Sequence, residues 1–254
     1  MQAQNSHSWT LRFSLLGIPV SIHPMSWVVL ALLGGAFGVS NSEDLNEMLL
    51  FVVAGMLCLL VHELGHALSG RATGALVEGI EISGLGGTTR FAMLPQQRWC
   101  HVLTVLAGPL ASLVLGGLFG LAFGLHLGNA WAGVRLAYLM PWCEYLPLDL
   151  QQQIMIGMHT HDVSTFWMQF YAVGMLVCFW WSVFNLLPIF PLDGGRFLAT
   201  LLNNYLIPCV MGLGCCVVLA LWAVWEAQWF NMLILGYLGF INWEYLRVFW
   251  KRRR

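Results

Sequence analysis

Long apolar stretches separated by short polar loops constrain the fold of this chain more than any other feature. Hydrophobic residues make up 59% of the 254 positions and charged residues only 9%, which is typical of a polytopic membrane protein and not of a soluble domain. A helix needs about 20 mainly apolar residues to cross the hydrocarbon core of a bilayer. We therefore predict an all-α membrane protein, a single domain over residues 1–254, with about six transmembrane helices at 25–39, 48–68, 102–125, 166–187, 207–225 and 230–245.

The basic residues predict how these helices are oriented. With the six spans above, ten of the eleven Lys and Arg residues fall on one side of the membrane, and Arg135 is the exception. By the positive-inside rule that side is the cytosol. Because the number of spans is even, both termini lie on this cytosolic side, and so does the C-terminal end of the second span. We expect a multi-pass protein of a bacterial or archaeal cell membrane.

The same composition bounds the partners. The formal net charge is −1, and the basic residues form no stripe apart from Lys251–Arg254, so nucleic acid is not expected as a partner. The lipid bilayer is the expected environment. We count a regulatory membrane partner among the candidate partners, and the sequence leaves the oligomeric state open.

His62, Glu63 and His66 form an H-E-x-x-H motif inside the second apolar stretch. On a helix the two histidines lie one turn apart on the same face, where both imidazoles can reach one Zn²⁺, and Glu63 lies beside them as a candidate base. A charge at the centre of a bilayer costs at least roughly 2.5 to 3.5 kcal/mol, which favours a functional reading over a chance match. Cys58 shares this face one turn earlier, and we interpret it as a packing residue, with metal ligation as the alternative.

Two histidines leave a catalytic zinc one protein ligand short, because such sites generally have three. The best candidate is Asp193, in the stretch from Asn185 to Arg196. Pro188 and Pro191 interrupt the fourth span there, and unwound backbone at membrane depth is tolerated only where it lines a protein cavity. We expect Asp193 at the level of the histidines, holding one Zn²⁺ per chain with them. The alternative is a turn residue before two glycines.

Residues 75–91 alternate between apolar and polar side chains and contain Gly84, Leu85, Gly86 and Gly87. Strand periodicity with glycine breaks does not suit a spanning helix, so we predict a short β-like, membrane-associated hairpin between the second and third spans. The third span carries glycines at 116, 120 and 124, which allow close helix contact. That contact is either inside the bundle or with a second copy.

Residues 127–165 form the one long extracytosolic segment, rich in proline and aromatic residues, and we interpret it as an interfacial lid. His159, His161 and Asp162 lie in it. They are read as solvated loop residues, with a second metal site as the alternative.

Taken together, these motifs resemble the site-2 protease family of intramembrane zinc metalloproteases. The resemblance rests on the H-E-L-G-H at 62–66, the N-x-x-P-x-x-P-L-D-G-G-R at 185–196, the Ala-Gly-Pro at 107–109 and the Ile-His-Pro at 22–24. It implies that His62, His66 and Asp193 are zinc ligands and Glu63 the base. It also implies that Asn185 helps to hold the substrate carbonyl and that the hairpin at residues 84–87 aligns the substrate strand.

One position departs from the family pattern. After Ala-Gly-Pro the family often has Asn, and position 112 is Ser. We expect this difference to affect helix packing and not the metal site.

The predicted function is an intramembrane zinc endopeptidase that cleaves a transmembrane segment of another protein near its cytosolic end. The alternative is a noncatalytic membrane protein with a structural or transport zinc site. Transport would require ionisable groups on several spans along a through-path, whereas here they cluster at one depth.

Overall fold

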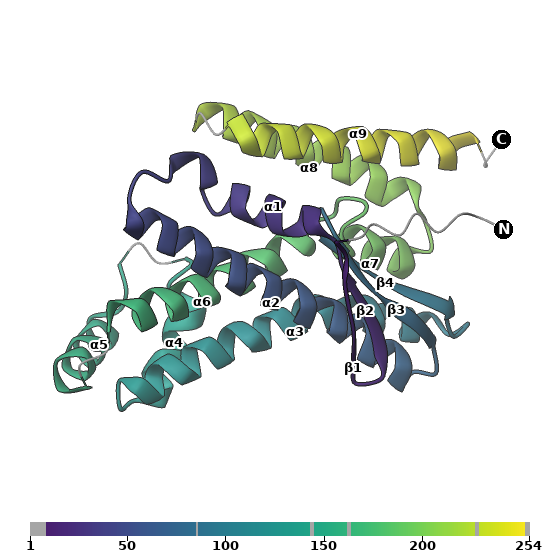
Figure 1. Ribbon diagram of the computed structural model, residues 1–254. Coiled ribbons are helices and arrows are strands. Elements are labelled where there is room, and N and C mark those ends of the chain that lie inside the picture. Colours follow the sequence, from purple (N-terminus) through teal and green to yellow (C-terminus); the bar gives the residue numbers. More distant parts are fainter. Residues whose placement is uncertain (1–8, 85, 143–144, 162–163, 227–228, 252–254) are drawn as a thin grey trace.

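The computed structural model describes residues 9–84, 86–142, 145–161, 164–226 and 229–251 (Figure 1). This part of the chain is mainly helical, with one small sheet at one end. The strands are β1 (Leu11–Leu15), β2 (Ile18–Ile22), β3 (Leu76–Ser83) and β4 (Gly86–Met93). The helices are α1 (Pro24–Leu33), α2 (Ser42–Ala72), α3 (Arg98–His126), α4 (Ala130–Leu139), α5 (Leu148–His161), α6 (Thr165–Asn185), α7 (Asp193–Leu202), α8 (Leu206–Trp225) and α9 (Trp229–Lys251), with a 3₁₀ turn at Ala36–Gly38.

Four helices in the described residues are long and apolar enough to cross a membrane: α2, α3, α6 and α8. They coincide with four of the six predicted spans, and the chain is a multi-pass membrane protein. The predicted span at 25–39 is instead the ten-residue α1, about 15 Å long, or half of a hydrocarbon core. The span at 230–245 corresponds to α9, which has 23 residues but contains two asparagines and three charged residues.

The sheet is larger than the predicted hairpin. Its strand order is β1-β2-β3-β4, with β1–β2 and β3–β4 antiparallel and β2–β3 parallel. The β3–β4 hairpin was expected, but β1 and β2 were not, although Ile18, Val20 and Ile22 alternate with polar or exposed positions and are all buried. Arg71, in the last turn of α2, donates to the Leu16 carbonyl at 3.0 Å and fastens the β1–β2 turn to that helix.

Small residues bring α3 close to its neighbours. A Cβ on Gly65 of α2 would lie 2.7 Å from the Ala111 Cβ, and one on Gly120 would lie 2.7 Å from the Ala137 Cβ of α4. Gly116 lies against Cys178 of α6. The glycine positions of α3 therefore serve contacts inside the bundle, as the first of the two interpretations predicted.

The segment 127–165, predicted as a lid, contains the helices α4 and α5 where the structure describes it. Arg135 of α4, the one basic residue on its predicted side, donates to Asp149 of α5 at 2.6 Å. This hydrogen bond lowers the pKa of the Asp149 carboxyl. The arginine charge is therefore balanced by a carboxylate beside it.

Candidate metal centre

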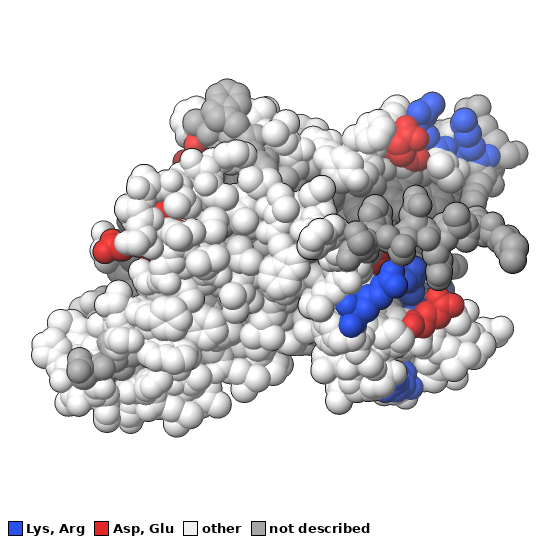
Figure 2. Space-filling model, viewed as in Figure 1, with Lys and Arg blue, Asp and Glu red and all other residues white. Residues whose placement is uncertain are grey.

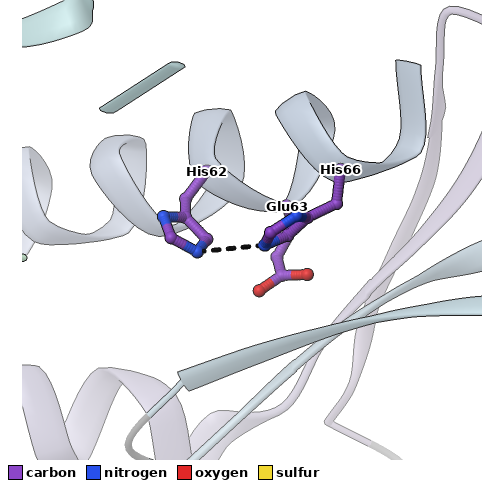
Figure 3. Close-up of side chains that lie close together, drawn as sticks. All are labelled: His62, Glu63 and His66. Atoms are coloured by element: carbon purple, nitrogen blue, oxygen red, sulfur yellow. Dashed lines mark hydrogen bonds between the residues drawn. The ribbon is translucent and has the colours of Figure 1, made fainter. Parts of the chain in front are cut away.

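The second helix places the H-E-x-x-H side chains in the interior of the protein. His62, Glu63 and His66 are 3%, 5% and 7% exposed, and all three project from one side of α2 toward the sheet (Figure 3). Their ligand atoms lie within 4.8 Å of one another, close enough to hold one metal ion. The 3.6-residue period of the helix is what places His62 and His66 on one face.

Asp193 reaches this pair from the other half of the chain. Its Oδ2 lies 3.0 Å from His62 Nε2 and 3.2 Å from His66 Nε2. The chain between α6 and α7 is non-helical at residues 186–192, as the prolines predicted, and α7 begins at Asp193. A Cβ on Gly194 would collide with the backbone carbonyls of Leu186 and Leu187, so glycine lets the turn fold back tightly. Asp193 was alternatively interpreted as a turn residue before two glycines. Its carboxylate instead contacts both imidazoles.

The hydrogen bond of His66 Nδ1 shows how its other ring nitrogen, Nε2, could bind a metal ion. His66 Nδ1 lies 2.7 Å from the Thr104 carbonyl, which can only accept, so Nδ1 carries the proton. In a neutral imidazole Nε2 then offers a lone pair, and it faces His62 Nε2 at 3.2 Å and a carboxylate oxygen. A metal ion bound by all three atoms would make this arrangement of acceptors favourable.

The spacing of the three atoms suits zinc. A tetrahedral Zn²⁺ with bonds of about 2.0 to 2.1 Å separates its ligand atoms by about 3.3 Å. The observed separations are 3.0, 3.2 and 3.2 Å. Gly108 of α3 leaves the room for this group, because a Cβ there would collide with the Nε2 atom of His66.

Ser112 touches this centre, contrary to the expectation that it affects helix packing alone. Its Oγ lies 3.1 Å from His62 Nδ1 and also donates to the Gly108 carbonyl at 3.4 Å. Because the Ser112 hydroxyl donates its proton to the Gly108 carbonyl, it accepts a hydrogen bond from the His62 Nδ1–H group. The lone pair of His62 Nε2 is then available to a metal ion. Position 112 lies one turn after Gly108 on the same face of α3, and only the packing of α3 against α2 brings that face to His62.

The carboxylate of Glu63 is held by the sheet. Thr89 of β4 donates to Glu63 Oε2 at 2.8 Å and lies 3.0 Å from the Glu63 carbonyl. Gly87 is against the same side chain, because a Cβ there would meet Glu63 Oε1 at 2.6 Å. The predicted hairpin therefore borders the centre directly. Thr89 was not predicted, because only the β3–β4 register shows which hairpin residue faces α2.

Other predicted positions lie as follows. Asn185 is buried at the last position of α6 and donates from Nδ2 to its own helix at the Trp181 carbonyl, 2.9 Å away. Gly84 and Gly86 lie at the hairpin turn, and Leu85 is outside the described residues.

Cys58 packs in an apolar cluster with Met175 and Cys178, as expected of a packing residue. His159 and His161 lie on α5, and Asp162 is outside the described residues.

Comparison with known families agrees with this geometry. The model of peptidase family M50 matches residues 50–208, which is more than half of the chain and includes every member of the centre. The chain belongs to peptidase family M50. The site-2 protease resemblance drawn from its motifs is thereby confirmed.

The chain is also similar to zinc metalloproteases, or putative ones, of other organisms. The zinc metalloprotease MJ0392 of Methanocaldococcus jannaschii is 24% identical over 195 residues, covering 76% of this chain and 45% of that protein. The protein sll0528 of Synechocystis sp. is 26% identical over 196 residues, covering 74% of this chain and 42% of that protein. This chain thus matches less than half of the length of either relative.

A solved structure supports the fold. The site-2 protease from Methanocaldococcus jannaschii superposes with a TM-score of 0.55 at 18% identity, covering 94% of this chain and 95% of that one. At this identity the likeness concerns the arrangement of helices and strands. The M50 assignment and the side-chain geometry carry the argument about chemistry.

Proposed function

We propose that this protein is an intramembrane zinc endopeptidase that cleaves a transmembrane segment of another membrane protein near its cytosolic end. The observation that carries the proposal is the convergence of two imidazoles and two carboxylates, all buried, among helices that are long and apolar enough to cross a membrane. Such groups are expensive at membrane depth and are retained there for function. The M50 membership gives that function its reaction class.

His62, His66 and Asp193 would hold one Zn²⁺ per chain, leaving the fourth position of a tetrahedral site open. Zinc bound there would polarise the scissile carbonyl and lower the pKa of a water to about 7. The Thr104 carbonyl and the Ser112 hydroxyl orient the two imidazoles so that both Nε2 lone pairs face the centre. Such outer partners also make the imidazoles more basic ligands.

Glu63 would act as the general base and then as the general acid. Its carboxylate takes a proton from the attacking water and returns it to the leaving amine. The Thr89 hydroxyl holds one carboxylate oxygen, Oε2, and the other, Oε1, faces Gly87. Asn185 uses one of its two amide hydrogens within α6, and the second would donate to the substrate carbonyl.

The substrate would bind as an extended strand beside β4. A helix satisfies its own backbone groups and cannot enter a peptidase cleft, so the substrate span must unwind first. β4 is the last strand of the sheet, and Gly87 and Thr89 of this strand border Glu63. Main-chain hydrogen bonds to such an edge give affinity with little dependence on side chains.

Charge distribution supports a cytosolic location of the active-site end. On the face drawn in Figure 2, the Lys and Arg side chains lie over the strands and the C-terminal end of α9, and the described surface of α4 and α5 shows none there. By the positive-inside rule the sheet end faces the cytosol.

The geometry argues against a transport site. Among the described residues, the buried charged or histidine side chains are His62, Glu63, His66 and Asp193, and all belong to one centre. A through-path would need such groups at successive depths. A cluster at one depth suits hydrolysis.

Co-expression with a library of tagged single-span membrane proteins tests the proposal. The wild-type chain should release a cytosolic fragment from a subset of them, and Glu63→Gln should release none. The Glu63→Gln chain must still bind zinc for this comparison to isolate the base. Equal fragment release by both chains would contradict the assignment of Glu63.

A further inference from the structure

A buried asparagine of α9 binds the backbone of the segment that leads to Asp193. Asn242 is fully buried. Its Oδ1 accepts from the Phe190 N–H at 3.0 Å, and its Nδ2 donates to the Phe190 carbonyl at 2.6 Å. Nδ2 also donates to the Leu238 carbonyl of its own helix at 2.8 Å. One amide therefore satisfies both polar groups of the Phe190 backbone, as a neighbouring strand would.

Phe190 needs such a partner because it lies in the non-helical segment between α6 and α7. Unpaired backbone groups are costly where neither water nor a helix can satisfy them. Ile189 beside it is fully buried against Leu238 and Cys216, so the segment is enclosed. Asp193 follows Phe190 by three residues, which makes the position of this backbone decisive for its carboxylate.

We propose that Asn242 is a positioning residue that fixes Asp193 against His62 and His66. The inference rests on the proposed zinc site and adds to it a residue from α9. Asn242 lies outside residues 50–208, the part of the chain that the M50 model matches. The last helix, and not the matched region alone, thereby sets the geometry of the third ligand.

Substitution of Gly212 in α8 offers a second, independent way to disturb the contact between Asn242 and Phe190. A Cβ at this position would collide with Asn242 Oδ1 and would lie 2.8 Å from the Pro188 carbonyl. Alanine there must displace the amide or the segment it holds. Gly214, on the same helix, has open space where its Cβ would be, which makes it a matched control.

The experiment compares Asn242→Leu and Gly212→Ala with Gly214→Ala and Leu238→Ala, all as full chains in nanodiscs. Leu238→Ala removes buried packing beside Ile189 but keeps both bonds to Phe190. Hydrogen–deuterium exchange of peptides within 186–196 in zinc-free protein reports the Phe190 amide directly. Zinc affinity is measured by competition with a chelator, which needs no substrate.

We expect Asn242→Leu and Gly212→Ala to raise exchange in this peptide on the order of tenfold, as for loss of one buried hydrogen bond. Zinc affinity should fall roughly 10- to 100-fold, as for loss of outer-sphere support. Gly214→Ala and Leu238→Ala should match the wild type in both. If Asn242→Leu does not accumulate in the membrane, the Gly212→Ala and Gly214→Ala pair decides.

Unchanged exchange and zinc affinity in Gly212→Ala would overturn the inference. An equal loss in Leu238→Ala would also overturn it, because α9 packing alone would then explain the effect. A wild-type chain that binds no zinc would refute the proposed function instead, and the exchange measurement would still test the contact with Phe190.

Discussion

Four side chains define the chemistry at the scale of single residues, and substitution should separate their roles. His62→Ala, His66→Ala and Asp193→Ala should each remove most of the bound zinc, because each deletes one of three atoms spaced 3.0 to 3.2 Å apart. Glu63→Gln should keep about one zinc per chain, since Glu63 is assigned as a base and not a ligand. Metal analysis of the purified variants measures this. Full zinc occupancy in Asp193→Ala would show that the third ligand lies elsewhere.

Ser112 offers a finer test at the same scale. Ser112→Ala removes the acceptor for His62 Nδ1, so zinc affinity should fall by roughly 10- to 100-fold. Ser182→Ala is the matched control. Ser182 is an equally buried serine that donates to the Pro109 and Cys178 carbonyls. Equal zinc affinities in the two variants, measured by chelator competition, would exclude an orienting role for Ser112.

At the scale of elements, the sheet connects the substrate to the base. Ile82, in β3, pairs with Ile22 on one side and Gly87 on the other, so proline there would damage the sheet itself. Among the strands that the structure describes, β1 and β4 each have one open edge. Because β4 borders Glu63, substitutions in β4 test whether the substrate binds at the edge of the sheet.

Proline placed singly at Thr88, Arg90 and Phe91, which leaves the Thr89 hydroxyl in place, should impair cleavage at alternate positions, because alternate N–H groups point away from β3. Variants at the outward positions should keep normal zinc content. Proline at Arg12, in the opposite edge strand β1, serves as the control and should leave cleavage unchanged. Equal cleavage activity in all the β4 proline variants would show that the substrate does not bind along this edge.

At the scale of the whole molecule, the length of α2 predicts where the substrate is cut. The helix has 31 residues, about 46 Å, which exceeds a hydrocarbon core of roughly 30 Å. His62 lies twenty residues after Ser42, about 30 Å along the helix axis. The cut should therefore fall toward the cytosolic end of the substrate span, and mass spectrometry of the released fragment locates it. A cut in the extracytosolic half would contradict the proposed orientation.

Substrate unwinding gives a second prediction at this scale. Substrate spans should carry Gly, Pro or Asn near the cut, because these residues disfavour the helix. Replacing them by Leu should slow cleavage while membrane insertion, measured by carbonate extraction, stays normal. Unchanged cleavage of such Leu-substituted substrates would show that local helix stability does not limit the reaction.

Sequence reasoning identified the elements and side chains whose signals are local. Apolar length specified α2, α3, α6 and α8, and the helical period placed His62 and His66 on one face, because both depend only on neighbouring residues. Apolar length overestimated α1, which glycines end early at Gly34 and Gly35. It also missed β1 and β2, whose alternation spans only a few residues. β2 joins the rest of the sheet through β3, some sixty residues away, and β1 pairs only with β2.

By itself, the sequence determined that this is a multi-pass membrane chain with an H-E-x-x-H motif and a broken segment carrying Asp193. Only the tertiary structure decided which groups support them. Ser112, Thr89 and Asn242 act across 50, 26 and 52 residues of chain, on His62, Glu63 and Phe190. Such contacts have no periodic signature, because they depend on how helices and strands pack and not on the order of neighbouring residues. The packing of α3, β4 and α9 around α2 and the Asp193 segment therefore completes the centre.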